Sequence, residues 1–286
     1  MSNESSAPGD LSPAEFRKAA HGAVEWIADY LENPARYPVR SQVAPGDIKN
    51  SLPASPPEHG ESLEHMMSDF EAKIVPGITH WNNPAFFAYF SISGSYPGIL
   101  GELLAAGLNV NGMLWAASPS VTELEQVTLS WLRQLMGLSG DWFGEITDTA
   151  SVSTFYALAA AREALGLDVR TRGLAGRDDM TRLRVYCSEH AHSSVDKAVM
   201  ALGLGHENCV KIASDAEYRM KPDNLRAAIE RDIAAGYRPM AVVPTVGTTS
   251  VASIDPVRRV AEVAKEFGCW VHVDGAYGAS ATVVPE

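Results

Sequence analysis

The amino-acid sequence predicts an α/β fold in which a mostly parallel sheet is flanked by helices and preceded by an N-terminal helical segment. The first observation is that short runs rich in β-branched and aromatic residues alternate with helical patterns in the second half of the chain. Such alternation is typical of βαβ units, which build parallel sheets. The second observation is that the chain before this region carries amphipathic helical patterns.

The first predicted helix lies in "LSPAEFRKAAHGAVEWIADYLEN". Ser12 and Glu15 match a capping box, and Pro13 suits the first helical position. The apolar stripe of this helix comprises Phe16, Ala20, Val24, Ile27 and Leu31. Trp26 and Tyr30 lie off the stripe, and we regard them as candidates for covering a second surface, such as another subunit.

The remaining elements follow in order. "SLEHMMSDFEAKI" predicts a short helix ended by Pro76 and Gly77, and "SPSVTELEQVTLSWLRQLMGL" predicts a longer capped helix. The strand-like runs are "RVYCS", "CVKIA", "MAVVPTV" and "CWVHVD". Helices are predicted between these runs, after His192, from Asn224 and from Pro256.

Composition narrows the classes of partner and compartment. The chain of 286 residues is 46% hydrophobic and has a net charge of −12, which disfavours nucleic acid and anionic membrane surfaces as partners. Its 3 cysteines include no CxxC pair, which favours a reducing compartment. The start "MSNESSAPGD" lacks the features of a signal peptide, and no apolar segment is long enough to span a bilayer. We therefore expect a cytoplasmic protein that binds a small molecule.

Polar residues cluster where the predicted strands end. Asp274 follows "CWVHV", Thr248 and Thr249 follow "MAVVPTVG", and His190 and His192 follow "RVYCSE". Another cluster, "DTASVST", opens a predicted helix. Because ligands of open parallel sheets bind beyond the carboxyl ends of the strands, these clusters together predict a binding site at one edge of the sheet.

The helix start at "DTAS" is a candidate phosphate site, because its backbone N–H groups and positive dipole end face outward. The sequence lacks GxGxxG and GxxxxGK[ST], so a single phosphate is the better prediction than a dinucleotide or a triphosphate. A bare phosphate would repel the nearby carboxylate of Asp274, so a cationic group should lie between them. A pyridinium ring with a phosphate arm meets both demands.

Plainer explanations and a competing function stay open at this point. Taken singly, Asp274 could cap a loop, His192 could cap a helix and "DTAS" could be an ordinary helix N-cap. His190 with His192, and His272 with Asp274, could instead ligate zinc in a metal-dependent hydrolase. A third possibility is a non-catalytic relative that keeps the fold as a binding module. The preferred hypothesis assigns no metal ligands.

The sequence resembles the group II pyridoxal-phosphate-dependent decarboxylases, and most closely the aromatic-L-amino-acid decarboxylases. The segments that carry the resemblance are "PGITHWNNPAFFAYF", "SYPGILGELLAAGLN", "WAASPSVTELE", "DTASVSTFYALAAARE", "HAHSSVDKA", "TVGTTSVASIDP" and "HVDGAYGASA". The resemblance implies the type I fold of PLP-dependent transferases. Residues 1–78 would form a helical segment that interlocks across a homodimer, and residues 79–286 would form the PLP-binding large domain.

The resemblance also implies roles for individual residues towards pyridoxal 5′-phosphate. Asp274 should pair with the pyridine nitrogen and keep it protonated, and His192 should lie against the ring and help to position the substrate. The remaining implied cofactor contacts are Thr149, Ala150 and Ser151 at the phosphate, Thr249, and Ala276 beneath the ring. The implied reaction is the decarboxylation of an L-amino acid to its amine.

The aromatic stretch "HWNNPAFFAYF" is the candidate substrate pocket, with Trp81, Phe90 and Ile92 as its contacts. The alternative is that the aromatic residues of this stretch, namely Phe86, Phe87 and Tyr89, are plain core. The chain has "YFSIS" where aromatic-amino-acid decarboxylases commonly have "YFPTA". Ile92 offers no hydroxyl group, which favours phenyl, indole or other apolar side chains over hydroxylated ones.

The imine-forming lysine of the resembled family lies downstream of the "HVDGAY" aspartate, beyond Glu286. The lysines present, none in the matching context, are Lys18, Lys49, Lys73, Lys197, Lys211, Lys221 and Lys265. We therefore expect the chain to be the N-terminal part of a decarboxylase, without the small C-terminal domain, and to be inactive alone.

Overall fold

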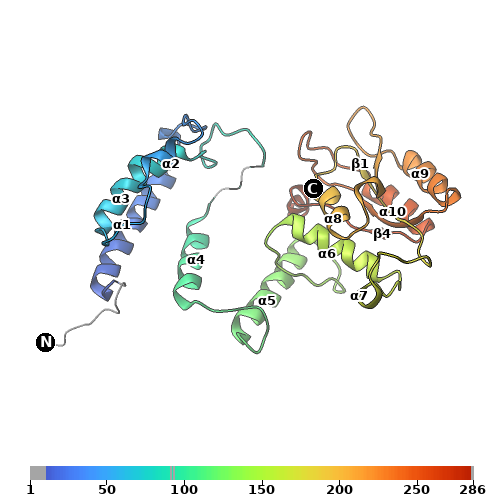
Figure 1. Cartoon of the computed structure of the whole chain (residues 1–286), viewed down its shortest axis with the longest axis horizontal. Coiled ribbons are helices and arrows are strands. Elements are labelled where there is room, and N and C mark those ends of the chain that lie inside the picture. Colours follow the sequence, from blue (N-terminus) through green and yellow to red (C-terminus); the bar gives the residue numbers. More distant parts are fainter. Residues whose placement is uncertain (1–10, 91, 93, 285–286) are drawn as a thin grey trace. The chain divides into compact units, whose positions relative to one another are not determined.

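A computed structural model describes residues 11–90, 92 and 94–284 (Figure 1). The chain forms two compact units, residues 1–108 and 109–286, and each is described by itself. The predicted boundary between residues 78 and 79 divides the dimer-interlocking segment from the cofactor-binding domain. It does not coincide with the division between the compact units after residue 108, and it stays a prediction. The first ten residues, which carry the prediction about a signal peptide, lie outside the described residues.

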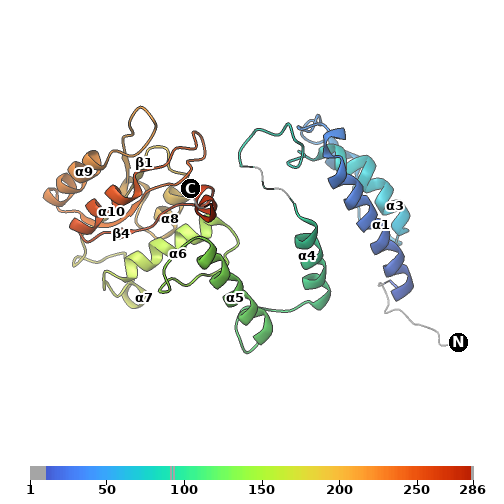
Figure 2. The ribbon, with the colours of Figure 1, turned by 180° about the vertical axis from the view of Figure 1, so that it is seen from behind.

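The first unit is helical, as the sequence predicts. Its opening helix has the predicted capping box: the Ser12 hydroxyl accepts from the Glu15 N–H at 3.3 Å, and the Glu15 carboxylate accepts from the Ser12 N–H at 2.8 Å. Its helices are α1 (Pro13–Glu32), α2 (Asp47–Ser51), α3 (Leu63–Asp69) and α4 (Tyr96–Leu108), with a π-helical turn at Phe70–Ile74 and 3₁₀ turns at Pro34–Arg36 and Val75–Gly77. Helices α1 and α3 lie side by side in both views (Figures 1 and 2), joined by an ion pair between Lys18 and Glu64 at 2.7 Å.

The aromatic pair on α1 is partly buried and packs against other parts of the first unit. It thus covers a second surface within this unit, and a contact with another subunit stays a prediction. Trp26 stacks on Tyr30 and meets the edge of Phe70, with ring centroids 5.5 and 5.0 Å apart. The Tyr30 hydroxyl lies 2.9 Å from Nδ1 of the buried His80. Phe16, on the predicted stripe, is 56% exposed. The partly buried face of α1 therefore includes Trp26 and Tyr30 together with Ile27 and Leu31 of the predicted stripe.

The second unit alternates strands and helices as predicted. Its strands are β1 (Leu183–Ser188), β2 (Cys209–Ile212), β3 (Arg238–Val243) and β4 (Trp270–Val271). Its helices are α5 (Pro119–Leu135), α6 (Ala150–Glu163), α7 (Val169–Arg172), α8 (Ser194–Ala201), α9 (Pro222–Ala234) and α10 (Val257–Glu266), with 3₁₀ turns at His206–Asn208 and Gly278–Val283. No helix in the described residues is long and apolar enough to cross a membrane.

The strands form a four-stranded parallel sheet in the order β2-β1-β3-β4. Its two faces are covered by different helices, because side chains alternate along each strand. Val185 and Cys187 of β1 pack with α6 and α8, whereas Tyr186 between them packs with α9 and α10. Figures 1 and 2 show this layered arrangement from opposite sides. The structure therefore confirms the predicted α/β class.

The connections of the sheet reverse direction between two neighbouring strands. From β1 the chain passes through α8 to β2 on one side, and from β3 it passes through α10 to β4 on the other. Such a reversal opens a crevice beyond the carboxyl ends of the two strands, which is the general ligand site of open α/β sheets. The fold thus places the segments after β1 and β3 at the position where a ligand is expected.

Candidate active site

Asp274 is fixed just beyond β4 by the neighbouring segment after β3. Its N–H donates to the Pro244 carbonyl at 2.9 Å, and its carbonyl accepts from the Val246 N–H at 2.8 Å. The side chain is buried at 7% exposure, and Oδ1 accepts from the Ala276 N–H at 3.3 Å. A buried carboxylate with a single weak backbone donor is a strong acceptor held ready for a further donor.

Thr245 lies directly beside Asp274 in the parallel ladder. Its side-chain oxygen is buried and has no hydrogen-bond partner within the described part of the chain. Burying an unpaired hydroxyl costs free energy. The unpaired hydroxyl and the buried carboxylate therefore mark one place where a polar ligand fits.

Asp255 anchors the start of the same segment. Its two carboxylate oxygens accept from the N–H groups of Met220 at 2.6 Å and Thr245 at 2.8 Å. Burial raises the pKa of Asp255, although these two backbone donors act in the opposite direction. Neither Thr245 nor Asp255 was singled out from the sequence. In the sequence, an aspartate before Pro256 looks like an ordinary helix start. Nothing in the pattern therefore indicated that Asp255 would bind two distant backbone N–H groups.

The loop after β3 separates the two predicted threonines. Thr248 is fully buried, and its hydroxyl lies 3.0 Å from the Ser253 hydroxyl and accepts from the Ser253 N–H at 3.0 Å. Thr249 is exposed. Thr248 therefore holds the loop together, whereas Thr249 lies on its exposed side.

The start of α6 carries the three residues that the resemblance implies at the phosphate, and the structure shows them as the N-cap and first residues of the helix. Thr149 is the N-cap residue, and its hydroxyl accepts from the Val152 N–H at 3.3 Å, while its carbonyl accepts from the Ser153 N–H at 3.1 Å. Ala150 and Ser151 are the first residues of this 14-residue helix, and N–H groups at such positions have no intrahelical acceptor. They lie at the positive end of the helix dipole, which attracts anions.

A side-chain contact joins α6 to the segment that carries Asp274. His272 Nε2 lies 3.2 Å from Thr154 Oγ1, and Thr154 is buried. Burial lowers the pKa of His272, although the neighbouring Asp274 acts in the opposite direction. The imidazole is therefore neutral near pH 7. The structure thus links α6, which begins with the predicted phosphate residues, to the segment that carries Asp274.

The two histidines after β1 have separate partners. His192 is exposed, and its Nδ1 accepts from the Ser194 N–H at 3.2 Å, so its ring caps the start of α8. His190 Nε2 lies 3.1 Å from the Ser214 hydroxyl. Among the described residues, no group of three or more His, Cys, Asp or Glu side chains is placed to hold a metal ion. This geometry does not favour the metal-dependent hydrolase.

The predicted substrate residues Trp81, Phe90 and Ile92 belong to the first unit. Trp81 stacks against Phe86 with ring centroids 5.0 Å apart, and Phe86 is buried. Phe87 and Tyr89 are 92% and 76% exposed, so they are not core residues of the described unit. Ile92 is 83% exposed.

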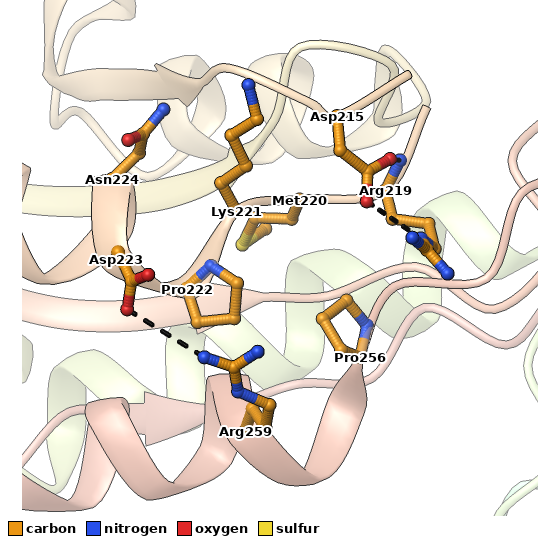
Figure 3. A pocket seen from close by; sticks show the side chains of 9 residues that line it. All are labelled: Asp215, Arg219, Met220, Lys221, Pro222, Asp223, Asn224, Pro256 and Arg259. Atoms are coloured by element: carbon orange, nitrogen blue, oxygen red, sulfur yellow. Dashed lines mark hydrogen bonds and ion pairs between the residues drawn. The ribbon is translucent and has the colours of Figure 1, made fainter. Parts of the chain in front are cut away.

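A separate hollow of about 340 Å³ lies at the start of α9 and α10 (Figure 3). Asp215 holds Arg219 at 2.8 Å, and Asp223 faces Arg259 at 3.8 Å across the hollow. The first pair lies within the loop before α9, and the second joins the start of α9 to α10 through mostly exposed side chains, which contributes little to stability. Both arginines of this hollow are therefore paired with carboxylates of its own lining.

Comparison with known proteins identifies the family. The pyridoxal-dependent decarboxylase conserved domain matches residues 45–286. The chain belongs to the pyridoxal-dependent decarboxylase family. A phenylacetaldehyde synthase of Petunia hybrida is 41% identical over 284 residues, with 96% of this chain and 55% of that protein covered. An L-tyrosine/L-DOPA decarboxylase of Lophophora williamsii is also 41% identical, with 96% of this chain and 53% of that protein covered.

Solved structures of pyridoxal-dependent decarboxylases share this fold. The tryptophan decarboxylase of Catharanthus roseus in complex with L-tryptophan has a TM-score of 0.89 at 38% identity, covering 97% of this chain and 60% of that chain. The Oryza sativa TDC with PLP and tryptamine has a TM-score of 0.89 at 37% identity. The present chain spans about half the length of the curated relatives it matches.

The residues of the second unit fit the cofactor that gives the pyridoxal-dependent decarboxylase family its name. A buried carboxylate at Asp274 suits a protonated pyridine nitrogen, and the outward N–H groups of Ala150 and Ser151 suit a phosphate. The unpaired buried hydroxyl of Thr245 supplies a further polar atom at this edge. The donor set therefore matches a flat cationic ring with an anionic arm.

Proposed function

We propose that the protein containing this chain uses pyridoxal 5′-phosphate to decarboxylate an aromatic L-amino acid to its amine and carbon dioxide. The observation that carries the proposal is the buried carboxylate of Asp274, next to the unpaired hydroxyl of Thr245 and linked through His272 and Thr154 to the N-terminus of α6. The relatives named as tyrosine, DOPA and tryptophan decarboxylases support the aromatic substrate class.

The cofactor, when bound, supplies an electron sink for the electron pair left behind when carbon dioxide departs. The residues of this chain would hold the cofactor in place and stabilise its charged groups. Asp274 would hold the proton on the pyridine nitrogen, because its buried carboxylate is stabilised by a cationic partner. Thr149, Ala150 and Ser151 would bind the phosphate at the dipole end of α6. Thr249 would add a hydroxyl contact from the loop after β3, and Ala276 would pack under the ring.

The substrate side of the proposal rests on His192 and on the aromatic stretch. His192 is exposed and held by Ser194, so its ring is available to position the substrate at the cofactor. Trp81, Phe90 and Ile92 would contact the substrate side chain. Because Ile92 carries no hydrogen-bonding group, we propose a phenyl or indole side chain rather than a catechol. Holding the substrate carboxylate in the reactive orientation can contribute up to about 7–11 kcal/mol to the rate.

The assembly and the compartment are part of the same proposal. We propose a homodimer in which residues 1–78 interlock with a second copy, consistent with exposed apolar side chains on α1 such as Phe16 and Val24. We also propose a cytoplasmic location, because the buried cysteines of the described chain, Cys187, Cys209 and Cys269, are unbridged.

Cofactor binding tests the proposal directly. Equilibrium dialysis of the 286-residue chain against pyridoxal 5′-phosphate is expected to show saturable binding. Asp274→Asn should weaken it by about tenfold to a hundredfold, because a hydrogen bond to a charged group contributes about 1.5–3 kcal/mol. Asp223→Asn is the matched control, since Asp223 has an 88% exposed side chain. Equal affinity of the Asp274 variant and the control, with both folded by circular dichroism, would contradict the assignment.

The substrate class is best tested on a polypeptide that contains this chain and matches the length of its relatives, of which the chain covers about half. Carbon dioxide release from L-phenylalanine, L-tyrosine and L-tryptophan should be compared with release from L-glutamate, together with separate measurement of amine and aldehyde products. We expect faster release from L-phenylalanine and L-tryptophan than from the hydroxylated L-tyrosine, with the amine as product. Turnover of L-glutamate alone would overturn the aromatic assignment, and absence of turnover with cofactor bound would favour a binding module.

A further inference from the structure

A pair of buried thiols lies in the sheet away from the proposed cofactor residues. Cys187 on β1 and Cys209 on β2 have their sulfur atoms 3.7 Å apart, which is van der Waals contact. Both are buried and face the side of the sheet covered by α6 and α8. In the strand register Cys187 is opposite Lys211 and Cys209 is opposite Val185, so the cysteines are diagonal neighbours.

A charged pair from the outer strand and α8 adjoins these thiols. Lys211 Nζ lies 3.3 Å from the Cys187 sulfur and 2.8 Å from Asp196 Oδ2. His206 Nε2 lies 3.3 Å from the other carboxylate oxygen of Asp196. The Lys211 side chain is 35% exposed, because β2 is the outer strand of the described sheet. A small polar molecule can therefore approach along Lys211.

The surroundings make the two thiols chemically unequal. The hydrogen bond with Cys209 and the nearby Lys211 ammonium lower the pKa of Cys187, although burial opposes them. The same hydrogen bond and burial raise the pKa of Cys209. Burial alone raises the pKa of the third thiol, Cys269, to about 11. Since the thiolate is the reactive form, Cys187 is the favoured nucleophile and Cys269 is not.

We propose that Cys187 and Cys209 form a redox-sensitive modification site that hydrogen peroxide converts reversibly to a disulfide. The Cys187 thiolate attacks one peroxide oxygen, the O–O bond breaks, and a sulfenic acid forms at Cys187 with release of hydroxide, which takes up a proton as water. The sulfur of Cys209 then displaces the sulfenic oxygen as a second water, and the S–S bond forms. Two thiols lose two electrons and two protons, and the peroxide is reduced to two waters.

The position in the sheet makes this disulfide easy to reduce. Bonded sulfurs lie about 2.05 Å apart, so the contacting sulfurs must approach further, and diagonal partners must shift the strands to allow it. Disulfides that require such a shift have more oxidising potentials and serve reversible chemistry. The bond would also tie β1 to β2 immediately before the loop that carries His190 and His192.

Peptide mapping of the peroxide-treated chain tests the proposal. We expect one linked peptide pair containing Cys187 and Cys209, lighter by two hydrogens, while Cys269 remains free to alkylate after denaturation. Dithiothreitol should restore both thiols. Cys209→Ser should leave Cys187 as a sulfenic acid that reacts with dimedone, and Cys269→Ser, the matched control, should form the disulfide like the unaltered chain.

The role of Lys211 gives an independent readout. Lys211→Met should slow alkylation of Cys187 at neutral pH by about tenfold, because each unit by which the thiol pKa rises removes about nine-tenths of the thiolate. Lys197→Met, on the exposed side of α8, should leave the rate unchanged. Three free thiols after peroxide, a bridge to Lys211 in place of Cys209, or equal reactivity of Cys187 and Cys269 would each overturn the proposal.

Discussion

His272 and Thr154 join the strand-end segment that carries Asp274 to the helix that begins at Ala150, through a contact of 3.2 Å between Nε2 and Oγ1. The backbone of His272 is already held by the sheet, since its N–H donates to the Val242 carbonyl at 3.0 Å. The contact therefore adds a polar link between the proposed ring and phosphate ends of the cofactor site. It acts together with the apolar packing of Leu158 and Ala161 of α6 against the sheet.

Replacement of Thr154 by valine should loosen this link. The variant keeps the shape of the side chain but leaves Nε2 of the half-buried His272 without this partner, which costs up to about 1–3 kcal/mol. We expect a lower free energy of unfolding in urea and weaker binding of pyridoxal 5′-phosphate. Thr128→Val on α5 is the control, because the Thr128 hydroxyl is exposed and bonds only the Leu124 carbonyl of its own helix. Equal losses in the two variants would argue against a special role for the link.

Acid should destabilise the chain through His272. Burial keeps the pKa of His272 in the folded state below its ordinary value of 6.5. Below about pH 6.5 the unfolded chain therefore binds a proton that the folded chain does not, and stability is lost as pH falls further. His272→Gln should flatten this part of the profile when the free energy of unfolding is measured between about pH 7.5 and about pH 5.5. His21→Gln, on the exposed face of α1, should keep the original slope.

The elements of the fold could be predicted where a local pattern decides them. The capping box at Ser12 and Glu15 and the alternating strands after residue 182 formed as expected. The partners of Trp26 and Tyr30 on α1 could not be predicted, because Phe70 and His80 lie far along the chain. The periodicity of a helix shows which of its faces is apolar, but it does not predict which distant aromatic residues will pack against that face.

In the candidate site, too, locally determined features could be predicted and features set by distant contacts could not. Asp274 and the helix start at Thr149 were visible because each ends or begins an element. Thr245 and Asp255 were missed because their importance comes from distant partners: Asp255 binds the N–H of Met220, 35 residues earlier. A buried unpaired hydroxyl, such as that of Thr245, has no sequence signature at all.

Asp255→Asn should destabilise the second unit. Each carboxylate oxygen accepts one backbone N–H, from Met220 and from Thr245. Asparagine offers only one oxygen and would turn an NH₂ group towards the other donor, which leaves that buried N–H unpaired at a cost of about 1–3 kcal/mol. Urea unfolding monitored by fluorescence should show a midpoint at a lower urea concentration than that of the unaltered chain. If Asp255→Asn unfolds no earlier than the exposed Asp223→Asn, the anchoring role is wrong.

Close backbone packing behind Asp274 makes Gly278 intolerant of any side chain. A Cβ atom there would lie 2.6 Å from the Val246 carbonyl oxygen, which belongs to the backbone of the segment after β3. That same carbonyl accepts from the Gly278 N–H at 3.1 Å, so the two segments are held in contact. Gly278→Ala must push them apart, and overpacking of this kind costs about 1–3 kcal/mol.

The displacement should also reach the cofactor site, because Val246 bonds directly to Asp274. We therefore expect Gly278→Ala to unfold earlier in urea and to bind pyridoxal 5′-phosphate more weakly. Gly22→Ala on α1 is the matched control, since a Cβ atom there meets nothing within 4 Å. It should be stabilising by about 0.5–1 kcal/mol, because alanine is the better helix former, and it should leave cofactor binding unchanged. Unaltered stability and affinity in Gly278→Ala would show that the two segments can separate without cost.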